Sequence, residues 1–298
     1  MKITKELLKE KGACAAGYRD FLKEYPADKY PDGVEYQELL DCCAEKNFEY
    51  GSWLLGAFGR TDDVRKIDGD LIVEKGIIFA GRLEVKGRIK AGWGIEAGCG
   101  IEAGDGIEAG YGIEAGDGIE AGWGIEAGYG IEAGCSIEAG YGIEAGCSIE
   151  AGLGIKAGCS IEAGLGIKAG LGIKAGCSIK AGLGIKAGCS IKAGCSIKAG
   201  WGIEAGCSIE AGWGIEAGCS IEAGCGIEAG DGIKAGDGIK AGYGIEAGDG
   251  IEAGCEFGIY AGLCCRITDK KFRKIIAKEH PENIMCGEFE EKKDDAVR

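Results

Sequence analysis

The chain has 298 residues, 60 of them glycine, and a formal net charge of −15. This charge repels nucleic acid and anionic membranes, so we expect neither direct nucleic-acid binding nor membrane binding. No run of about 18 apolar residues could span a bilayer. The start of the chain lacks the apolar core of a signal peptide, so we expect a cytoplasmic protein whose 17 cysteines, an odd number, are reduced.

Residues 1–64 form the first predicted unit, a small helical domain. Apolar residues recur there at helical spacing, and proline and glycine interrupt them. We expect three or four helices. We also expect Trp53, Leu54, Leu55 and Phe58 to cover the open end of the structure that follows.

Residues 65–88 change to short strand-like segments separated by glycines. Three of them are rich in aliphatic residues, namely Leu71–Val73, Ile77–Phe79 and Leu83–Val85. We interpret them as irregular first coils of a β-solenoid.

Residues 89–256 contain an isoleucine at every sixth position from Ile89 to Ile251, which makes 28 units. A short fixed period predicts a solenoid. Within a unit, Ile at position one and Ala at position three face one side of a strand, and Glu or Lys at position two faces the other. The glycine at position four is expected to bend the chain through a positive φ.

Units such as Ile155–Ser160, with an aliphatic first residue and a small fourth residue, resemble the hexapeptide-repeat left-handed β-helix family. This resemblance implies a mainly β, single-stranded parallel β-helix with left-handed coils of 18 residues. The stretch 81–92 also resembles the repeats of bactofilins, which are polymer-forming β-helical proteins.

A flat two-sided solenoid with 12-residue coils is the alternative architecture. Identical residues at position five recur slightly more often 12 residues apart, as in Trp201 and Trp213, than 18 apart, as in Cys177 and Cys195. Cross-linking of stacked cysteines distinguishes the two coil lengths.

Position five departs from the family pattern because it varies among Cys, Asp, Leu, Tyr and Trp. A close-packed interior does not tolerate such changes in volume, so this position should lie at an edge or point outward. Exposed aromatic residues in a charged surface are typical anchors of protein interfaces. The predicted partner-binding residues are these aromatics and three glutamates of position two: Trp93, Tyr111, Trp123, Tyr129, Tyr141, Trp201, Trp213, Tyr243, Glu204, Glu210 and Glu216.

Residues 257–298 should form a C-terminal cap and a charged tail. The isoleucine period breaks after Ile251, since the next member of the series is Ile259. We expect a short basic helix over 270–278, a strand over 284–286, and a mobile tail from Glu290.

The sequence argues against an enzyme. An acyltransferase of the hexapeptide family would need a histidine base within the repeats, yet the only histidine is His280. An ice-binding solenoid would need rows of threonine, which the repeats lack. The cysteines of position five could bind a soft metal, but small apolar residues on a weakly constrained row explain them better. We therefore expect no catalytic residue, cofactor or metal.

Two functional hypotheses follow. The first is a non-catalytic binding protein whose variable row and acidic faces contact a protein partner, for example an inhibitor that mimics the charge of nucleic acid. The second is a structural protein that associates with itself into dimers or filaments. The sequence names no partner, and a homodimer would explain the exposed row without one.

Overall fold

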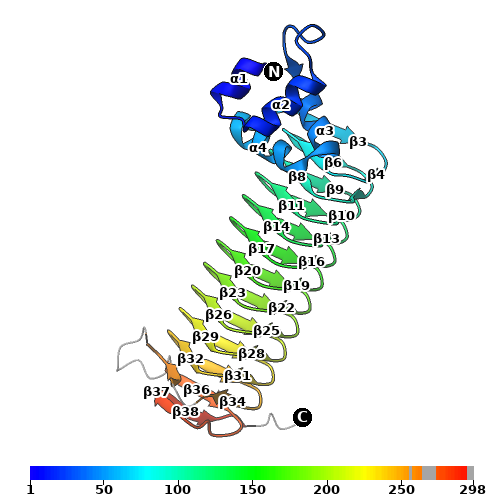
Figure 1. Ribbon diagram of the computed structural model, residues 1–298. Helices are drawn as coiled ribbons and strands as arrows, with labels where there is room; N and C mark the ends of the chain where they lie inside the picture. Colours follow the sequence, from blue (N-terminus) through cyan, green and yellow to red (C-terminus); the bar gives the residue numbers. More distant parts are fainter. Residues whose placement is uncertain (255–256, 264–272, 294–298) are drawn as a thin grey trace.

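The computed structural model describes residues 1–254, 257–263 and 273–293. It is an elongated parallel β-solenoid with a helical domain at its N-terminal end (Figure 1). Apart from β1 (Lys2–Ile3) and β2 (Val34–Glu35), which form an antiparallel pair, the strands belong to three long parallel sheets. The solenoid begins with β3 (Val64–Ile67), β4 (Leu71–Val73), β5 (Ile77–Phe79) and β6 (Arg82–Val85).

The regular strands coincide with the isoleucine repeat. From β7 (Ile89–Ala91) to β34 (Ile251–Ala253) every repeat contributes one strand, of which β29 (Ser220–Ala223) and β32 (Gly238–Ala241) begin one residue early. Each covers the Ile-Glu-Ala or Ile-Lys-Ala triplet of its unit, so the predicted strands are confirmed.

Every third strand belongs to the same sheet. We name the three sheets and their outer surfaces by their first strands: the β3 face has 13 strands, the β4 face 11 and the β5 face 12. Ile107 of β10 (Ile107–Ala109) pairs with Ile125 of β13 (Ile125–Ala127), and this 18-residue register recurs along the repeats. The 18-residue coil is therefore confirmed and the 12-residue alternative is wrong. The left-handed sense of the coil stays a prediction. Thirteen strands at about 4.8 Å give a solenoid about 58 Å long.

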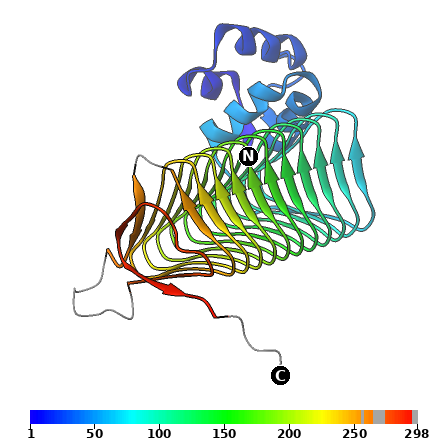
Figure 2. The ribbon, with the colours of Figure 1, turned by 90° about the horizontal axis from the view of Figure 1, so that it is seen from below.

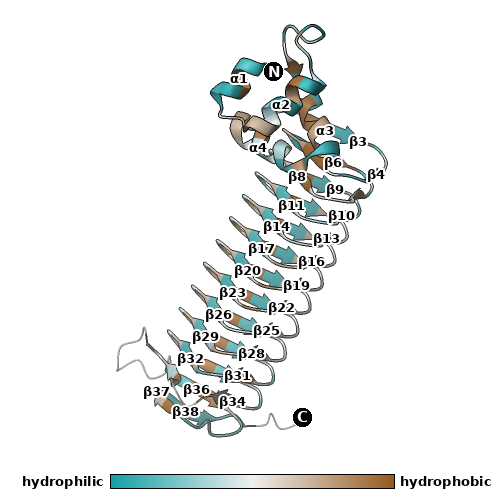
Figure 3. Ribbon diagram, in the orientation of Figure 1, coloured by the Kyte–Doolittle hydropathy of each residue, from teal (hydrophilic) through white to brown (hydrophobic). Residues whose placement is uncertain are grey.

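The interior consists of stacked isoleucines and alanines. Ile155 and Ala157 are 1% and 4% exposed, whereas Lys156 between them faces solvent. The alternation of hydrophobic and hydrophilic residues is visible along the strands in Figure 3. The division of positions one to three between core and solvent is confirmed, and burial of these rows is the main stabilising contribution.

The glycines at position four play a different role from the one expected. No glycine of the regular coils has a positive φ in the described residues. Instead, a Cβ on Gly176 would lie 1.9 Å from the carbonyl oxygen of Gly158, one coil earlier. Glycine is required because two backbones approach closely there, not because the chain needs a left-handed conformation. The expectation of a positive φ is wrong.

The N-terminal domain contains four helices, as expected: α1 (Lys5–Glu10), α2 (Ala15–Glu24), α3 (Tyr36–Lys46) and α4 (Phe48–Phe58). Thr4, Cys14 and Asn47 cap α1, α2 and α4 by accepting backbone N–H groups with their side chains. Asn47 also ends α3 and therefore separates two consecutive helices.

The helical domain packs on the side of the solenoid rather than over its open end. In Figure 2 it projects beyond one side of the stacked coils. Its core includes Leu54, Leu55 and Ile78, and Ile78 is the outward residue of β5. Trp53 is 37% exposed. The expected role of α4 as an end cover is therefore wrong, because the irregular coil offers an apolar outer residue, Ile78, where later coils carry Glu or Lys.

Two polar side chains finish the first coil. The Gln37 amide of α3 donates to the carbonyl oxygen of Ile78 (2.7 Å) and accepts from the N–H of Ala80 (3.1 Å), so it occupies the place of a further strand. Arg65, in register with the inward Leu83, lies over the ring of Phe79 (4.7 Å to the centroid) and binds Asp41 of α3 (3.3 Å). Together they satisfy one strand edge and shield part of the open interior.

The C-terminal end continues the sheets with irregular strands: β35 (Gly258–Ala261), β36 (Lys274–Ala277), β37 (Ile284–Cys286) and β38 (Glu288–Glu291). The expected helix over 270–278 is wrong over 274–277, where Ile275 pairs with Ile245 of β33 (Ile245–Ala247); residues 270–272 lie outside the described residues. The strand over 284–286 is confirmed. Glu290 belongs to β38 and pairs with Ile276, so the expected tail cannot begin there.

Candidate interaction surface on the corners and faces of the solenoid

Position five lies at the three corners of each coil. We name a corner by the faces it joins: the 3–4, 4–5 and 5–3 corners. At each corner, the backbone N–H of position five donates to the carbonyl oxygen of the position-five residue one coil earlier, as from Tyr129 to Tyr111 (2.8 Å). The single variable row of the sequence is therefore three separate columns, each one coil per residue. The prediction that this position lies at an edge is confirmed.

The eight predicted aromatic residues divide unequally among the corners. Trp93, Tyr111, Tyr129 and Trp201 belong to the 4–5 corner. Trp123, Tyr141 and Trp213 belong to the 3–4 corner, and Tyr243 alone belongs to the 5–3 corner. The β4 face is thus the face that has aromatic columns along both edges.

These aromatic side chains are exposed. Trp123 is the most open at 69%, and Trp93 the least at 40%. Tyr111 and Tyr129 stack in parallel with ring centroids 5.2 Å apart, and the Lys75 ammonium lies 4.5 Å from the ring centroid of Trp93. Neighbouring aromatics on one corner therefore form a continuous apolar strip, a typical anchor for a partner.

The β4 face is also grooved. A hollow of about 780 Å³ runs between the 3–4 corner and the position-two side chains, with Trp123 and Tyr141 on one side and Glu126 and Glu144 on the other. A second hollow of about 390 Å³ lies further along the same face, beside Lys198, Glu216 and Lys234. The floor of both includes glycines of position six, which have no side chain to fill the space.

Charge changes sign along the solenoid. Nine consecutive units, from Glu102 to Glu150, carry glutamate at position two, which gives three carboxylates per coil. Seven lysines follow between Lys156 and Lys198, interrupted by Glu162, and we call them the basic belt. Five glutamates from Glu204 to Glu228 come next.

Ion pairs join the ladders where their charge changes. Glu162 binds Lys180 (2.6 Å) and Lys198 binds Glu216 (2.7 Å) on the β4 face. On the β5 face, Lys168 pairs with Glu150. These groups are solvent-exposed, so each pair contributes little stability; their value is a fixed pattern of charge.

The three predicted glutamates do not form one cluster. Glu204, Glu210 and Glu216 occupy the β5, β3 and β4 faces at neighbouring levels. Each is bonded to a lysine of the basic belt one coil earlier, and the Lys192 ammonium holds the pKa of Glu210 below its ordinary range. Sequence reasoning missed the longer ladders between Glu102 and Glu150. Counting position two at a lag of 18 could have found them.

The cysteines of position five form two ladders of three. Cys159, Cys177 and Cys195 stack at the 3–4 corner, and a second ladder at the 5–3 corner contains Cys189, Cys207 and Cys225. Burial, followed by the neighbouring Cys177 thiol, raises the pKa of Cys159. Within the described ranges, no group of three or more His, Cys, Asp or Glu side chains is arranged to hold a metal ion.

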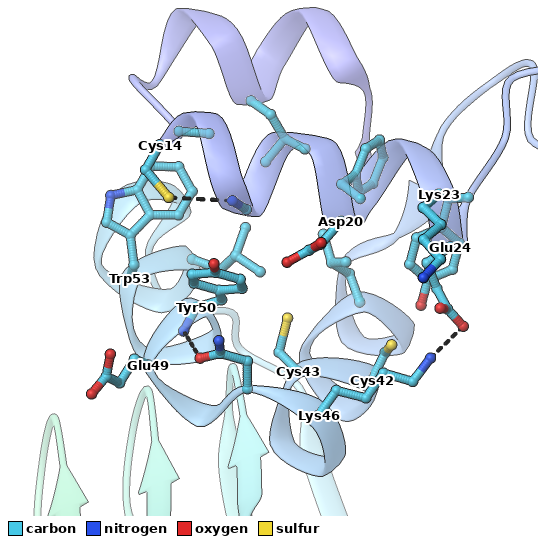
Figure 4. Close-up of a pocket in the computed structure, with 18 of the residues that line it drawn as sticks. Cys14, Asp20, Lys23, Glu24, Cys42, Cys43, Lys46, Glu49, Tyr50 and Trp53 are labelled. Carbon is cyan, nitrogen blue, oxygen red and sulfur yellow. Dashed lines mark hydrogen bonds and ion pairs between the residues drawn. The ribbon is translucent and has the colours of Figure 1, made fainter.

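The helical domain contains a pocket that sequence reasoning did not predict. It is a cavity of about 520 Å³ between α2 and the α3–α4 pair (Figure 4). Trp53 and Cys14 lie at one end, and an ion pair between Glu24 and Lys46 (2.5 Å) closes the other. Burial raises the pKa of the Cys43 thiol in its wall to about 12, so this thiol stays protonated at neutral pH. Its lining combines two acidic and basic pairs with apolar side chains and specifies no ligand.

No family model, curated protein or solved structure matches this chain. The described residues include no helix long and apolar enough to cross a bilayer. The functional argument therefore rests on the corners, faces and charge of the solenoid.

Proposed function

We propose that this chain is a non-catalytic binding protein whose acidic coils present the charge of nucleic acid to a cationic protein surface. The observation that supports this proposal is the run of three carboxylates per coil from Glu102 to Glu150. At a coil spacing of about 4.8 Å, the run carries one negative charge per about 1.6 Å of axis. Double-stranded DNA carries one per about 1.7 Å.

The acidic run also has a suitable shape. Its glutamates are in register on three faces of a narrow rod, so the carboxylates surround the axis as phosphates surround a duplex. Asp105 and Asp117 add two carboxylates at the corners. The basic belt that begins at Lys156 limits the mimicry to about three coils, which favours a partner with a short basic site.

The repeat motif supports a finer proposal about architecture and place. We propose that the solenoid shares the left-handed coil of the hexapeptide-repeat family, on the basis of units such as Ile155–Ser160. We also propose a cytoplasmic location, since the stacked cysteines are free thiols.

A competition assay tests charge mimicry. A basic, sequence-independent DNA-binding protein is loaded with a fluorescent 20-base-pair duplex, and the full chain is titrated into the complex. The chain should displace the duplex, and the triple variant Glu102→Gln, Glu120→Gln, Glu138→Gln should need at least about fivefold more protein because counterion release is reduced.

The matched control is the triple variant Glu204→Gln, Glu210→Gln, Glu216→Gln. It removes the same charge from glutamates that already bind lysines. It should displace the duplex nearly as well as the unmodified chain. Equal losses in the two variants, or no displacement by the unmodified chain, would reject mimicry.

Self-association into a structural assembly is the second candidate. β3 and β4 are terminal strands that have a sheet neighbour on one side only, and such edges can pair with another chain. Sedimentation velocity over a hundredfold range of concentration tests this: a filament-forming protein should gain mass without limit, and a fixed mass argues against filaments.

A further inference from the structure

We propose that the β4 face binds the β4 face of a second copy in an antiparallel homodimer whose two-fold axis passes between β19 (Ile161–Ala163) and β22 (Ile179–Ala181). This inference does not depend on charge mimicry, because the acidic ladders of the β3 and β5 faces stay open in such a dimer. Three features of the β4 face support it: its charge order, its corner residues and its area.

The charge order of the β4 face reverses about this point. Counting outward from the axis, position two reads Glu162, Glu144, Glu126, Glu108, Lys90 in one direction and Lys180, Lys198, Glu216, Lys234, Glu252 in the other. A two-fold axis brings the members of these two series together in order. Four of the five pairs are then of opposite charge, and each occurs twice in the dimer.

The direction of the second copy follows from the same pattern. A parallel arrangement would place each residue against its own copy, so that glutamate would face glutamate and lysine would face lysine along the whole face. An antiparallel arrangement repels at one pair alone, Glu126 with Glu216 of the partner copy. Charge complementarity therefore selects both the orientation and the register.

The corner residues match under the same operation, which places each corner against the same corner of the partner copy. At the 3–4 corner, Trp123 faces Trp213, and Cys159 faces Cys177. At the 4–5 corner, Leu165 faces Leu183 across the axis. These columns stay apolar for three coils on both sides of the axis, and the 3–4 corner reaches aspartate at the fourth coil on each side.

The other two faces lack this combination. The β3 face has a comparable reversal of charge between Glu138 and Lys156, but there Asp117 would face Leu171 at the 5–3 corner. The β5 face is partly covered by the helical domain, which buries Glu96 of β8 (Ile95–Ala97) beside Ser52. The β4 face is the one that joins complementary charge to apolar edges.

The area suits a specific interface. Ten coils of about 4.8 Å and a face roughly 15 Å wide give about 700 Å² per copy, close to the usual value of about 800 Å². The exposed rings of Trp123 and Trp213, 69% and 60% open in the single chain, would supply central anchors.

Charge variants of the full chain test the register by sedimentation velocity or light scattering. Lys180→Glu places like charges across the axis twice and should weaken the dimer at least about tenfold. The exchange of both residues, Glu162→Lys with Lys180→Glu, should restore it. The matched control is Lys168→Glu on the β5 face, which breaks an equivalent ion pair within the chain and should leave the dimer unchanged.

One variant should strengthen the dimer. Glu126→Lys converts the single repulsive pair into an attractive one opposite Glu216 and should tighten association about fivefold. Its control is Glu132→Lys on the β5 face, which also places lysine between two glutamates of its ladder. Similar effects of the two lysine variants would show that net charge, not the register, controls association.

A zero-length carbodiimide cross-link tests the direction. Lys234 and Glu108 lie seven coils apart in one chain, about 34 Å, so they cannot be linked within it. The antiparallel dimer brings them together, and mass spectrometry should find this link together with Lys198–Glu144. A monomer at about 100 μM, or a dimer without these links, would overturn the proposal.

Discussion

A Cβ atom on Gly158 would lie 1.9 Å from the carbonyl oxygen of Gly140, one coil earlier. Gly166 at position six is different, because its Cβ would stay 3.6 Å from the nearest atom, the carbonyl oxygen of Gly184. Gly158→Ala should therefore destabilise the fold by about 3 kcal/mol, since backbone must move to admit the methyl group. Gly166→Ser should cost little. Thermal unfolding of the two variants compares the positions, and equal losses would contradict this explanation of the glycine pattern.

Gln37 should anchor the helical domain. Its amide makes two hydrogen bonds with the backbone of β5, so Gln37→Met keeps the length of the side chain but leaves two backbone groups without these partners. We expect a loss of about 1–3 kcal/mol. Amide hydrogen exchange at Ala80 should become faster, whereas exchange at Ile155, in the middle of the solenoid, should not change. Unchanged protection at Ala80 would show that the amide does not secure this edge.

Glu96 should make stability depend on pH. Burial, followed by repulsion from Glu114, raises its pKa above the ordinary range of a glutamate. A raised carboxyl pKa contributes stability that is present below the unfolded-state pKa and is lost as pH rises through the folded-state pKa. Glu96→Gln should therefore raise the melting temperature at pH 7 by about 2 °C and have little effect near pH 4.

Ser52→Ala is the matched control for that experiment. The Ser52 hydroxyl donates to the Glu96 carboxylate and lowers its pKa, in opposition to burial. Its removal should destabilise the protein more at pH 7 than at pH 4, with the opposite sign to Glu96→Gln. The same sign for both variants would mean that ionisation of Glu96 does not cause the effect.

The regular coils could be predicted from sequence because local and global requirements repeat together. Ile155, Lys156 and Ala157 fix which side of a strand is buried, and the same choice recurs in every unit. Coil length was harder to predict, because identical residues at position five recur at both lags and do not record which corner they occupy. The pairing of Ile107 with Ile125 supplies that information.

The ends and the candidate surface depended on three-dimensional placement. Ile78 and Arg65 exchange the usual roles of outward and inward residues, so binary patterning could not place the helical domain. At the other end, Lys274–Ala277 has helical spacing of apolar residues but continues a sheet through Ile275. The aromatic residues were correctly expected at an edge, yet only the three-sided coil shows which of them border one face.

Mild oxidation should link cysteines that stack one coil apart. The N–H of Cys177 donates to the carbonyl oxygen of Cys159 (2.8 Å), and that of Cys195 donates to Cys177 (2.8 Å), so neighbouring Cα atoms lie near the strand spacing of about 4.8 Å. This is within disulfide reach. Cys135 and Cys147 lie at different corners and should not be linked within one chain.

Each ladder of three cysteines can form one disulfide and must leave one thiol free. Digestion and mass spectrometry of the oxidised monomer should find Cys177 joined to Cys159 or to Cys195. Cys177→Ser should abolish the disulfide in this ladder, because the two remaining cysteines lie two coils, about 9.6 Å, apart. Cys159→Ser should retain a disulfide between Cys177 and Cys195. The reaction should accelerate with rising pH, because burial raises the pKa of Cys159 and the thiolate is the reacting form. A disulfide between Cys159 and Cys195 in the Cys177→Ser chain would contradict the stacked arrangement of this corner.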